Sequence, residues 1–468
     1  MAHGMEEGRK VEKEGEDIIL PKAKKSFASS FRLFFKSLGP GLVTGGSDND
    51  ASGIATYSQA GAQFGYGLLW MAVVTLPMVM IVQEMCARIG IVSGNGLSQI
   101  IKQHYSKKLL YSIASLLLIA NTINIGADIG AMGASLKLLI PQVPFFISTL
   151  IFTGIILSAE IFISYKTYSK VLKYLTLSLF FYVVTAFLAV HDGSEWYNIA
   201  KSTVIPHFEF NKVFVLMIIA ILGTTISPYL FFWQTAQEVE EEVKKGKIEK
   251  MDEKEDHHHQ HYYHSKPKIT KAEVKNMRID IITGMSLAQA IFWFIMITSA
   301  STLHNNGVTN ISTAQEAAKA LEPLVKGFPH SGQIAGALFA AGIIGTGLLA
   351  VPVLAASASY TISESFGWKE GLYKKFVQAP RFYSIIVAST VIGLWINFSN
   401  IDPIQALVYT AVINGFVSVP VLIMVSRISN NKKVLGDQVN KKISNVIVTI
   451  TIVAMASASA AMVAYNWI

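Results

Sequence analysis

The sequence predicts an all-α membrane protein that crosses the bilayer about eleven times. Hydrophobic residues make up 51% of the chain, charged residues only 15%, and the mean hydropathy is +0.43. These values exclude an ordinary soluble domain. Apolar runs of roughly 20 residues, the length of a helix that spans a bilayer, recur along nearly the whole chain, and polar residues interrupt two of them. The expected spans are 38–58, 66–91, 109–134, 143–164, 168–190, 211–236, 277–302, 331–362, 381–398, 404–427 and 443–466.

The loops set the expected orientation in the cell membrane. Lys and Arg gather in alternate loops, for example at 102–108, 166–173 and 427–442, and loops rich in these residues are cytoplasmic. We therefore expect the N-terminus inside and the C-terminus outside. Residues 1–37 contain no apolar run of the kind that a cleavable signal peptide needs, so we expect them to form a cytoplasmic tail.

The spans divide into two groups of five and one extra helix. The first five-helix repeat covers 38–190, the second covers 211–427, and 443–466 is the eleventh helix. Because five is odd, the second repeat is inverted relative to the first.

Two polar stretches lie between these spans. The longest is the cytoplasmic loop 238–275, which contains the histidine-rich run 257–264. Imidazoles could bind Zn, Ni or Cu there, but we expect a solvated tract without a role in transport. On the other side of the membrane, the spacing of apolar positions predicts a short surface helix over 314–326.

Composition also excludes several classes of function. The formal net charge of +8 is the excess that positive cytoplasmic loops produce, and no aromatic residues alternate with it to bind bases, so we expect no nucleic acid partner. The single cysteine, Cys86, excludes an internal disulfide and a cysteine-based metal cluster. We find no Walker motif, zinc-hydrolase pair or nucleophile elbow, and so expect neither enzymatic activity nor a cofactor. A monomer in the lipid bilayer is the expected state.

The first interruption is the segment 45–53 (GGSDNDASG). Its glycines lower the cost of unwinding a helix, and Asp48 and Asp50 place carboxylates where a charge costs at least ~2.5 kcal/mol. Either aspartate could cap the N-terminus of a half-helix. Because two neighbouring carboxylates rarely share that task, at least one is expected to bind a cation, and whether Asp48 joins Asp50 stays open.

The second interruption is the segment 223–228 (GTTISP). Pro228 removes a backbone donor and ends a helix, which frees carbonyls ahead of it. These carbonyls, the hydroxyls of Thr224 and Ser227 and one carboxylate form an all-oxygen environment, which suits Mg²⁺, Ca²⁺ or Mn²⁺. Two broken helices in equivalent positions of two repeats indicate a secondary transporter with its site at the bilayer midplane.

Several sequence blocks resemble the Nramp family of divalent-metal transporters. They are 39–41 (GPG), 50–53 (DASG), 61–66 (GAQFGY), 87–94 (ARIGIVSG), 223–228 (GTTISP) and the loop 303–324. The resemblance covers nearly the whole chain after the N-terminal tail. It implies a LeuT-like inverted repeat, import of Mn²⁺ or Fe²⁺ in typical members, and usually coupling to protons.

The chain departs from the family pattern at the expected ligands. The family's Asp ligand falls on Asp50, but its Asn ligand falls on Gly53, and its Ala and soft Met ligands fall on Thr224 and Ser227. A hydroxyl in place of a thioether favours harder ions, and Gly in place of Asn enlarges the cavity. Since Mg²⁺ keeps several waters when bound, we expect Mg²⁺ or Mn²⁺, with Fe²⁺ behind both. The expected site comprises Asp50, the carbonyl region of Ala51 and Thr224, the hydroxyls of Thr224 and Ser227, and the space at Gly53.

Further polar residues within the spans are candidates for the ion pathway. Asp128 resembles an acidic position of the family's proton path, but the second acidic position, three residues earlier, falls on Ile125. We therefore expect weak or absent proton coupling. Asp128 could instead hydrogen-bond a neighbouring helix, and so could Gln234 and Asn414. The full set of pathway candidates is Asp48, Asn124, Asp128, Tyr229, Gln234 and Asn414, where Tyr229 occupies the position of a family His.

Two other functions remain open at this point. One is a sodium- or proton-coupled amino-acid transporter of the same architecture, in which half-helix N-termini bind a substrate carboxylate; the carboxylate of Asp50 would repel such a substrate. The other is a channel or a metal-sensing protein regulated by the histidine-rich loop. A channel needs rings of carbonyls or charges around an oligomeric axis, whereas two asymmetric breaks in one chain favour a carrier.

Overall fold

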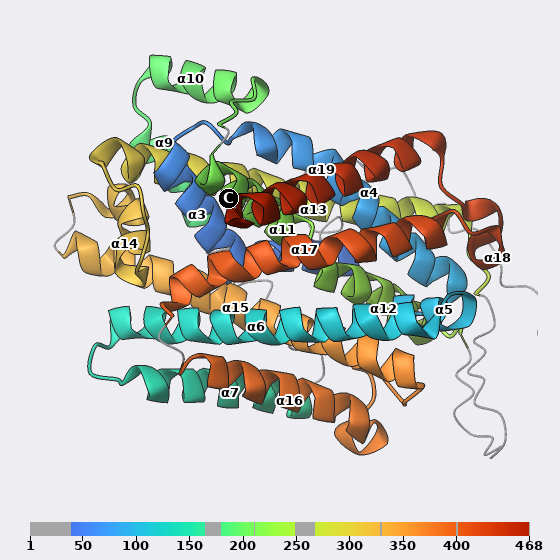
Figure 1. Cartoon of the computed structure of the whole chain (residues 1–468). Coiled ribbons are helices and arrows are strands. Elements are labelled where there is room, and N and C mark those ends of the chain that lie inside the picture. The colour runs from blue at the N-terminus through green and yellow to red at the C-terminus, as the bar shows by residue number, and fades with distance from the viewer. Residues whose placement is uncertain are drawn as a thin grey trace, which may run out of the picture. The chain divides into compact units, whose positions relative to one another are not determined.

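A computed structural model describes residues 39–163, 179–209, 211–248, 267–327, 330–398 and 401–467 (Figure 1). Throughout these ranges the regular elements are helices, as the sequence predicts. The expected tail 1–37 and the histidine-rich run 257–264 lie outside the described residues.

Each expected span corresponds to one helix or to a pair of helices, except that residues 168–178 of the expected span 168–190 lie outside the described residues. The pairs are α2 (Pro40–Asp48) with α3 (Ala51–Phe64), and α11 (Lys212–Thr225) with α12 (Pro228–Lys244). The others are α4 (Trp70–Ser93), α6 (Lys107–Leu139), α7 (Phe145–Phe162), α9 (Phe180–Ala189), α13 (Lys271–Thr302), α15 (Ser331–Phe366), α16 (Pro380–Ile396), α17 (Pro403–Ser429) and α19 (Lys442–Trp467). Among the described residues, 8 candidate spans are long and apolar enough to cross a membrane, and α9 and α16 are shorter apolar helices.

The cytoplasmic loop expected over 238–275 is shorter in the structure. Helix α12 continues to Lys244 and α13 begins at Lys271, so the loop starts at 245. The acidic residues Glu238, Glu240 and Glu242, which suggest a solvated loop in the sequence, are 5%, 4% and 0% exposed. Each has a polar partner: Gln234, four residues earlier, for Glu238; the hydroxyl of Tyr360 for Glu240; and Lys245, three residues later, for Glu242.

The connections contain short helices. Residues 314–326 form α14 (Ala314–Ala318) and the 3-10 helix η3 (Lys319–Val325), which agrees with the expected surface helix, and a capping box between Thr313 and Glu316 starts it. Two further helices, α5 (Leu97–His104) and α10 (Gly193–Val204), are not among the predicted elements. The remaining short elements are η2 (His304–Asn306), η4 (Phe376–Gln378), α18 (Lys432–Leu435) and η5 (Gly436–Gln438).

Glycines let the broken helices approach their neighbours. Helix α2 crosses α13 where Gly45 meets Gly284, and α11 crosses α17 where Gly223 meets the backbone of Ala411 and Gly415; a Cβ on Gly45 or Gly223 would collide with that backbone. Close packing of small residues is how helices associate in lipid, because no hydrophobic force distinguishes helix from lipid there. The glycines therefore let α2 and α11 pack closely on α13 and α17 just before the two breaks.

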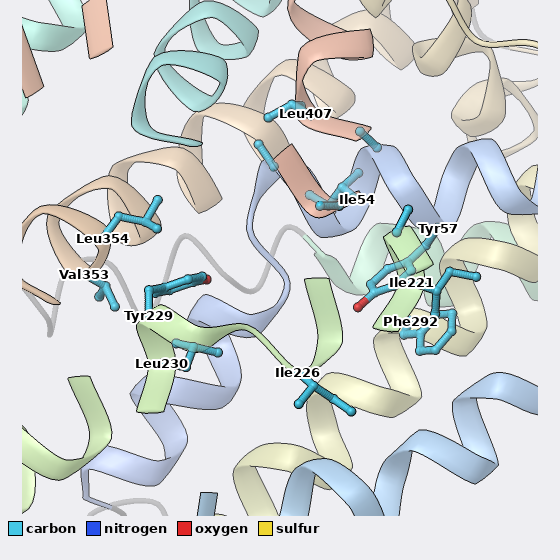
Figure 2. Close-up of a cluster of buried hydrophobic side chains, with 14 of the residues drawn as sticks. Ile54, Tyr57, Ile221, Ile226, Tyr229, Leu230, Phe292, Val353, Leu354 and Leu407 are labelled. Atoms are coloured by element: carbon cyan, nitrogen blue, oxygen red, sulfur yellow. The ribbon is translucent and has the colours of Figure 1, made fainter. Parts of the chain in front are cut away.

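Buried apolar side chains surround the two breaks (Figure 2). Tyr57 of α3 stacks on Phe292 of α13 with ring centroids 4.0 Å apart. Figure 2 shows Ile226 and Tyr229 beside the second break and Leu354 of α15 facing it, and all of these side chains are 0–1% exposed. The breaks thus lie inside the helix bundle, away from the lipid-facing surface.

Candidate functional site

The first break separates α2 from α3 at Asn49 and Asp50. Asp50 is the N-cap of α3, and its Oδ1 accepts a hydrogen bond of 2.7 Å from the amide of Gly53. A short acidic residue suits this position because it satisfies a free amide and faces the positive end of the helix dipole. Asn49 donates to the carbonyl oxygen of Ala288 of α13 at 3.2 Å, which holds the unwound segment against that helix.

The second break separates α11 from α12 at Ile226 and Ser227. Pro228 is the first residue of α12, where its missing N–H is no loss. The hydroxyl of Ser227 lies 2.9 Å from the carbonyl oxygen of Gly223 and 2.7 Å from that of Thr224. Ser418 of α17 donates to the carbonyl oxygen of Ile226 at 2.6 Å. Hydroxyl groups therefore satisfy several of the carbonyls that the proline frees.

The two breaks meet at Gly53 and Thr224. A Cβ built on Gly53 would lie 3.5 Å from Thr224 Oγ1 and 3.2 Å from the carbonyl oxygen of Asp48. Tyr57 and Thr225 connect α3 to α11 through a hydrogen bond of 3.1 Å. The structure thus brings together the predicted residues Asp50, Ala51, Gly53 and Thr224, whereas the hydroxyl of Ser227 bonds within its own turn.

Tyr229 and Asn124 reach the second oxygen of Asp50. The hydroxyl of Tyr229 lies 3.3 Å from Asp50 Oδ2 and 2.9 Å from the carbonyl oxygen of Ser47. Asn124 of α6 approaches the same Oδ2 at 3.5 Å. These are long hydrogen bonds, weaker than the short one that Oδ1 makes. Oδ2 is therefore the oxygen of Asp50 that is available to a ligand.

Helix α6 carries a further buried carboxylate beside the site. Asp128 lies one turn after Asn124, on the same face of the helix. It is 0% exposed, and neither of its oxygens has a hydrogen-bond partner in the described part of the chain. Ile125 is also 0% exposed and packs at Gly393 of α16, where a Cβ would lie 2.9 Å from Ile125 Cγ2.

The two remaining pathway candidates lie in different surroundings. Gln234 accepts a hydrogen bond of 2.5 Å from Thr44 of α2 and donates to Glu238 at 2.9 Å, so it connects the two half-helices on the expected cytoplasmic side. Asn414 of α17 is 2% exposed, and its Oδ1 has no partner among the residues that the structure describes. Of the two, only Asn414 offers a free acceptor.

Burial and chemistry limit what the site can bind. Asp50, Thr224 and Ser227 are 1–2% exposed, so the site is closed to both sides in this structure. In the described ranges, no group of three or more His, Cys, Asp or Glu side chains is placed to hold a metal ion. Any metal ion would therefore be held by one or two carboxylates together with hydroxyls, carbonyls and water, a donor set that suits hard cations.

A separate cavity of about 680 Å³ lies where α6 ends and α15 and α17 begin. Its charged lining residues are Lys137, Lys319, Glu322 and Asp402, and none of the predicted site residues contributes to it. Partial burial raises the pKa of Asp402 above its ordinary value. Lys137 follows Asp128 by nine residues on α6, which places the cavity about 14 Å further along that helix. It lies on the expected extracellular side of the site.

The contacts of Tyr229 with Asp50 and Ser47, and the hydrogen bond of Asn49 to α13, were not predicted from the sequence. Tyr229 follows Pro228 directly, and that position in the first turn of a half-helix was the available signal. Asn49 carried no signal beyond its place between two aspartates.

Known proteins resemble this chain in sequence and in fold. The family described as "Natural resistance-associated macrophage protein-like" (Nramp) matches residues 41–465. A relative described as "Divalent metal cation transporter MntH" from Yersinia enterocolitica is 24% identical over 432 residues, covering 90% of this chain and 92% of its own. The protein of the same description from Klebsiella pneumoniae is 24% identical over 411 residues, with 86% and 88% covered.

Solved structures agree with the LeuT-like fold that the sequence predicts. The crystal structure of the Eremococcus coleocola manganese transporter superposes with a TM-score of 0.67 at 18% identity, covering 93% of this chain and 87% of that one. Mhp1, a nucleobase-cation-symport-1 family transporter, superposes with a TM-score of 0.55 at 13% identity, with 92% of both chains covered. The family match extends over almost the entire described structure, and this chain therefore belongs to the Nramp family.

Proposed function

We propose that this protein is a secondary carrier of hard divalent cations, Mg²⁺ or Mn²⁺, that works by alternating access around Asp50. The observation that carries the proposal is the position of Asp50 Oδ2 at the junction of two broken helices, with only long hydrogen bonds to Tyr229 and Asn124. Membership in a family of transporters and similarity to divalent metal cation transporters support it.

The donor set supports hard ions over soft ones. The residues at the two breaks present oxygen atoms: the carboxylate of Asp50, the hydroxyl of Thr224 and the carbonyls that end α2 and α11. Mg²⁺ and Mn²⁺ prefer such donors, and Mg²⁺ retains waters that a site with few protein ligands can accommodate. Fe²⁺ ranks behind both because no thioether occupies the position of Ser227.

Weak or absent proton coupling is the second part of the proposal. A proton path along α6 needs successive titratable side chains. One of these is missing, because Ile125 occupies the position of an acidic residue in the family. Ile125 is buried and packs at Gly393, and its hydrocarbon side chain can neither donate nor accept a proton. Asp128 alone would not relay protons between the site and α16.

The amino-acid alternative fits the site less well. A substrate carboxylate would need the free amides at the N-terminus of α3, but Asp50 Oδ1 already accepts the hydrogen bond of Gly53. The remaining Oδ2 would repel an anion. A divalent ion is thus cargo here, and the proposal requires neither a cofactor nor an enzymatic step. We place the protein in the cell membrane as a monomer with a cytoplasmic N-terminus.

The experiment is Mn²⁺ uptake into proteoliposomes that contain wild type, Asp50→Asn or Asp192→Asn. Asp192 caps the surface helix α10 and is exposed, so its variant controls for reconstitution. We expect uptake in wild type and Asp192→Asn and none in Asp50→Asn. Equal uptake in all three proteins would exclude Asp50 as the binding residue.

A further inference from the structure

Asp48 is a buried carboxylate without a structural role. It is the last residue of α2 and is 1% exposed. Neither of its oxygens accepts a hydrogen bond from any residue that the structure describes. Burial of a charge without a partner is strongly unfavourable, so a residue of this kind persists where a ligand compensates for it.

Capping does not explain Asp48. The sequence left open whether Asp48 or Asp50 caps the half-helix, and the structure places Asp50 at the N-cap of α3. Asp48 lies at the opposite kind of terminus, the C-terminal end of α2, where the helix dipole and the free carbonyls are negative. Burial, the negative end of the α2 dipole and the neighbouring carboxylate of Asp50 all make a negative charge on Asp48 energetically unfavourable.

The position of Asp48 on α2 directs it toward the site. Thr44, one turn earlier, bonds to Gln234 of α12, and Gly45, three residues earlier, packs against Gly284 of α13. The side chain of Asp48 therefore starts from the face of α2 that lies between α12 and α13. Tyr229 and Tyr57 lie beside this segment: the hydroxyl of Tyr229 donates to the carbonyl oxygen of Ser47, and a Cβ on Gly53 would lie 3.2 Å from the carbonyl oxygen of Asp48 and 3.3 Å from Tyr57 Cε2.

We propose that Asp48 binds the transported divalent cation directly, as a second carboxylate beside Asp50. This inference rests on the proposed function for the identity of the ion. Two carboxylates supply the charge of −2 that balances a divalent cation, whereas a monovalent cation would leave one buried charge uncompensated. Asp48 thus gives the site its preference for divalent ions, while its oxygen donors leave hard ions favoured over soft ones.

The test compares Asp48→Asn with wild type, because an amide has the same shape as a carboxylate but no charge. Full-length protein in detergent is unfolded by heat with and without Mg²⁺ or Mn²⁺, and uptake of both ions is measured in proteoliposomes. We expect the Tm of Asp48→Asn to exceed that of wild type without ions, the ion-induced rise in Tm to disappear, and KM for both ions to rise at least tenfold. Asp48→Glu, which keeps the charge, should retain part of the ion-induced rise.

Asp50→Asn, measured in parallel, distinguishes this inference from the proposed function. If Asp50→Asn loses uptake while Asp48→Asn keeps the KM and the ion-induced rise of wild type, the role of Asp48 is refuted and the carrier proposal stands. If Asp48→Asn only lowers Tm, equally with and without ions, Asp48 is structural and the inference is also refuted. If wild type neither binds nor transports these ions, the proposed function fails together with the inference.

Discussion

Gly53→Ala tests whether the ion occupies the space between the two breaks. The added methyl group would lie 3.2 Å from the carbonyl oxygen of Asp48, 3.3 Å from Tyr57 Cε2 and 3.5 Å from Thr224 Oγ1. Two of these contacts are tighter than ordinary van der Waals contacts, and crowding of this degree costs about 1–3 kcal/mol. Because Gly53 lies in the first turn of α3, the higher helix propensity of Ala offsets up to about 1 kcal/mol of this crowding cost.

These opposing terms predict a variant that folds but transports poorly. The contacts above lower the stability of the ion-free protein, and the methyl group also takes space that a bound ion or its water would need, which adds crowding in the ion-bound state. A cost of about 1–3 kcal/mol there lowers the apparent affinity about 5- to 150-fold, and more for hydrated Mg²⁺ than for Mn²⁺.

The assay for Gly53→Ala is the concentration dependence of Mg²⁺ and Mn²⁺ uptake into proteoliposomes, with Tm as a check of folding. Gly154→Ala is the matched control, because Gly154 lies on an exposed face of α7 with no atom within 4 Å of its added Cβ. Gly53→Ala with the KM of Gly154→Ala would show that the ion does not use this space.

Three further outcomes follow from the packing and the loops. Gly223→Ala should lower Tm markedly, by overpacking of about 1–3 kcal/mol or more, because its Cβ would lie 2.5 Å from the backbone nitrogen of Gly415; an unchanged Tm in detergent would contradict the close contact of α11 and α17. Gln234→Leu should destabilise the protein by about 1–3 kcal/mol, because it leaves Thr44 and Glu238 without their hydrogen-bond partner. The double variant Gln234→Leu, Thr44→Val should lose less stability than the sum of the two single variants. Strictly additive changes in Tm would argue against the hydrogen bond between Gln234 and Thr44. Deletion of 254–266, which lies outside the described residues, should leave the uptake rate unchanged, and a clear loss of uptake would give the histidine-rich loop a role in transport.

The positions of both helix breaks could be predicted because their causes are local. Pro228 lacks the backbone N–H that would continue α11 and suits the first position of α12, and Gly45, Gly53 and Asp50 mark a segment that unwinds and starts again. Hydropathy likewise located the apolar helices: among the described residues 8 are long and apolar enough to cross a membrane, and α9 and α16 are shorter. The family resemblance, based on short blocks of residues, is confirmed by the match over 41–465.

Contacts between distant parts of the chain could not be predicted. Gln234 and Thr44 are separated by 190 positions in the sequence, so the sequence alone left open whether Gln234 lines a pathway or bonds to another helix. Glu240 resembled part of a solvated loop because its buried partner, the hydroxyl of Tyr360, is 120 positions away in the sequence. Helix α10, in contrast, had a local signal: Asp192 at its N-cap.

The most direct test of the account is Mg²⁺ uptake into proteoliposomes with the internal pH followed in the same vesicles, for wild type and Asp50→Asn. The account predicts that wild type takes up Mg²⁺ as well as Mn²⁺ without acidification of the lumen, and that Asp50→Asn takes up neither ion. Uptake of Mn²⁺ that excludes Mg²⁺ and acidifies the lumen would contradict both the hard-ion site and the missing proton relay.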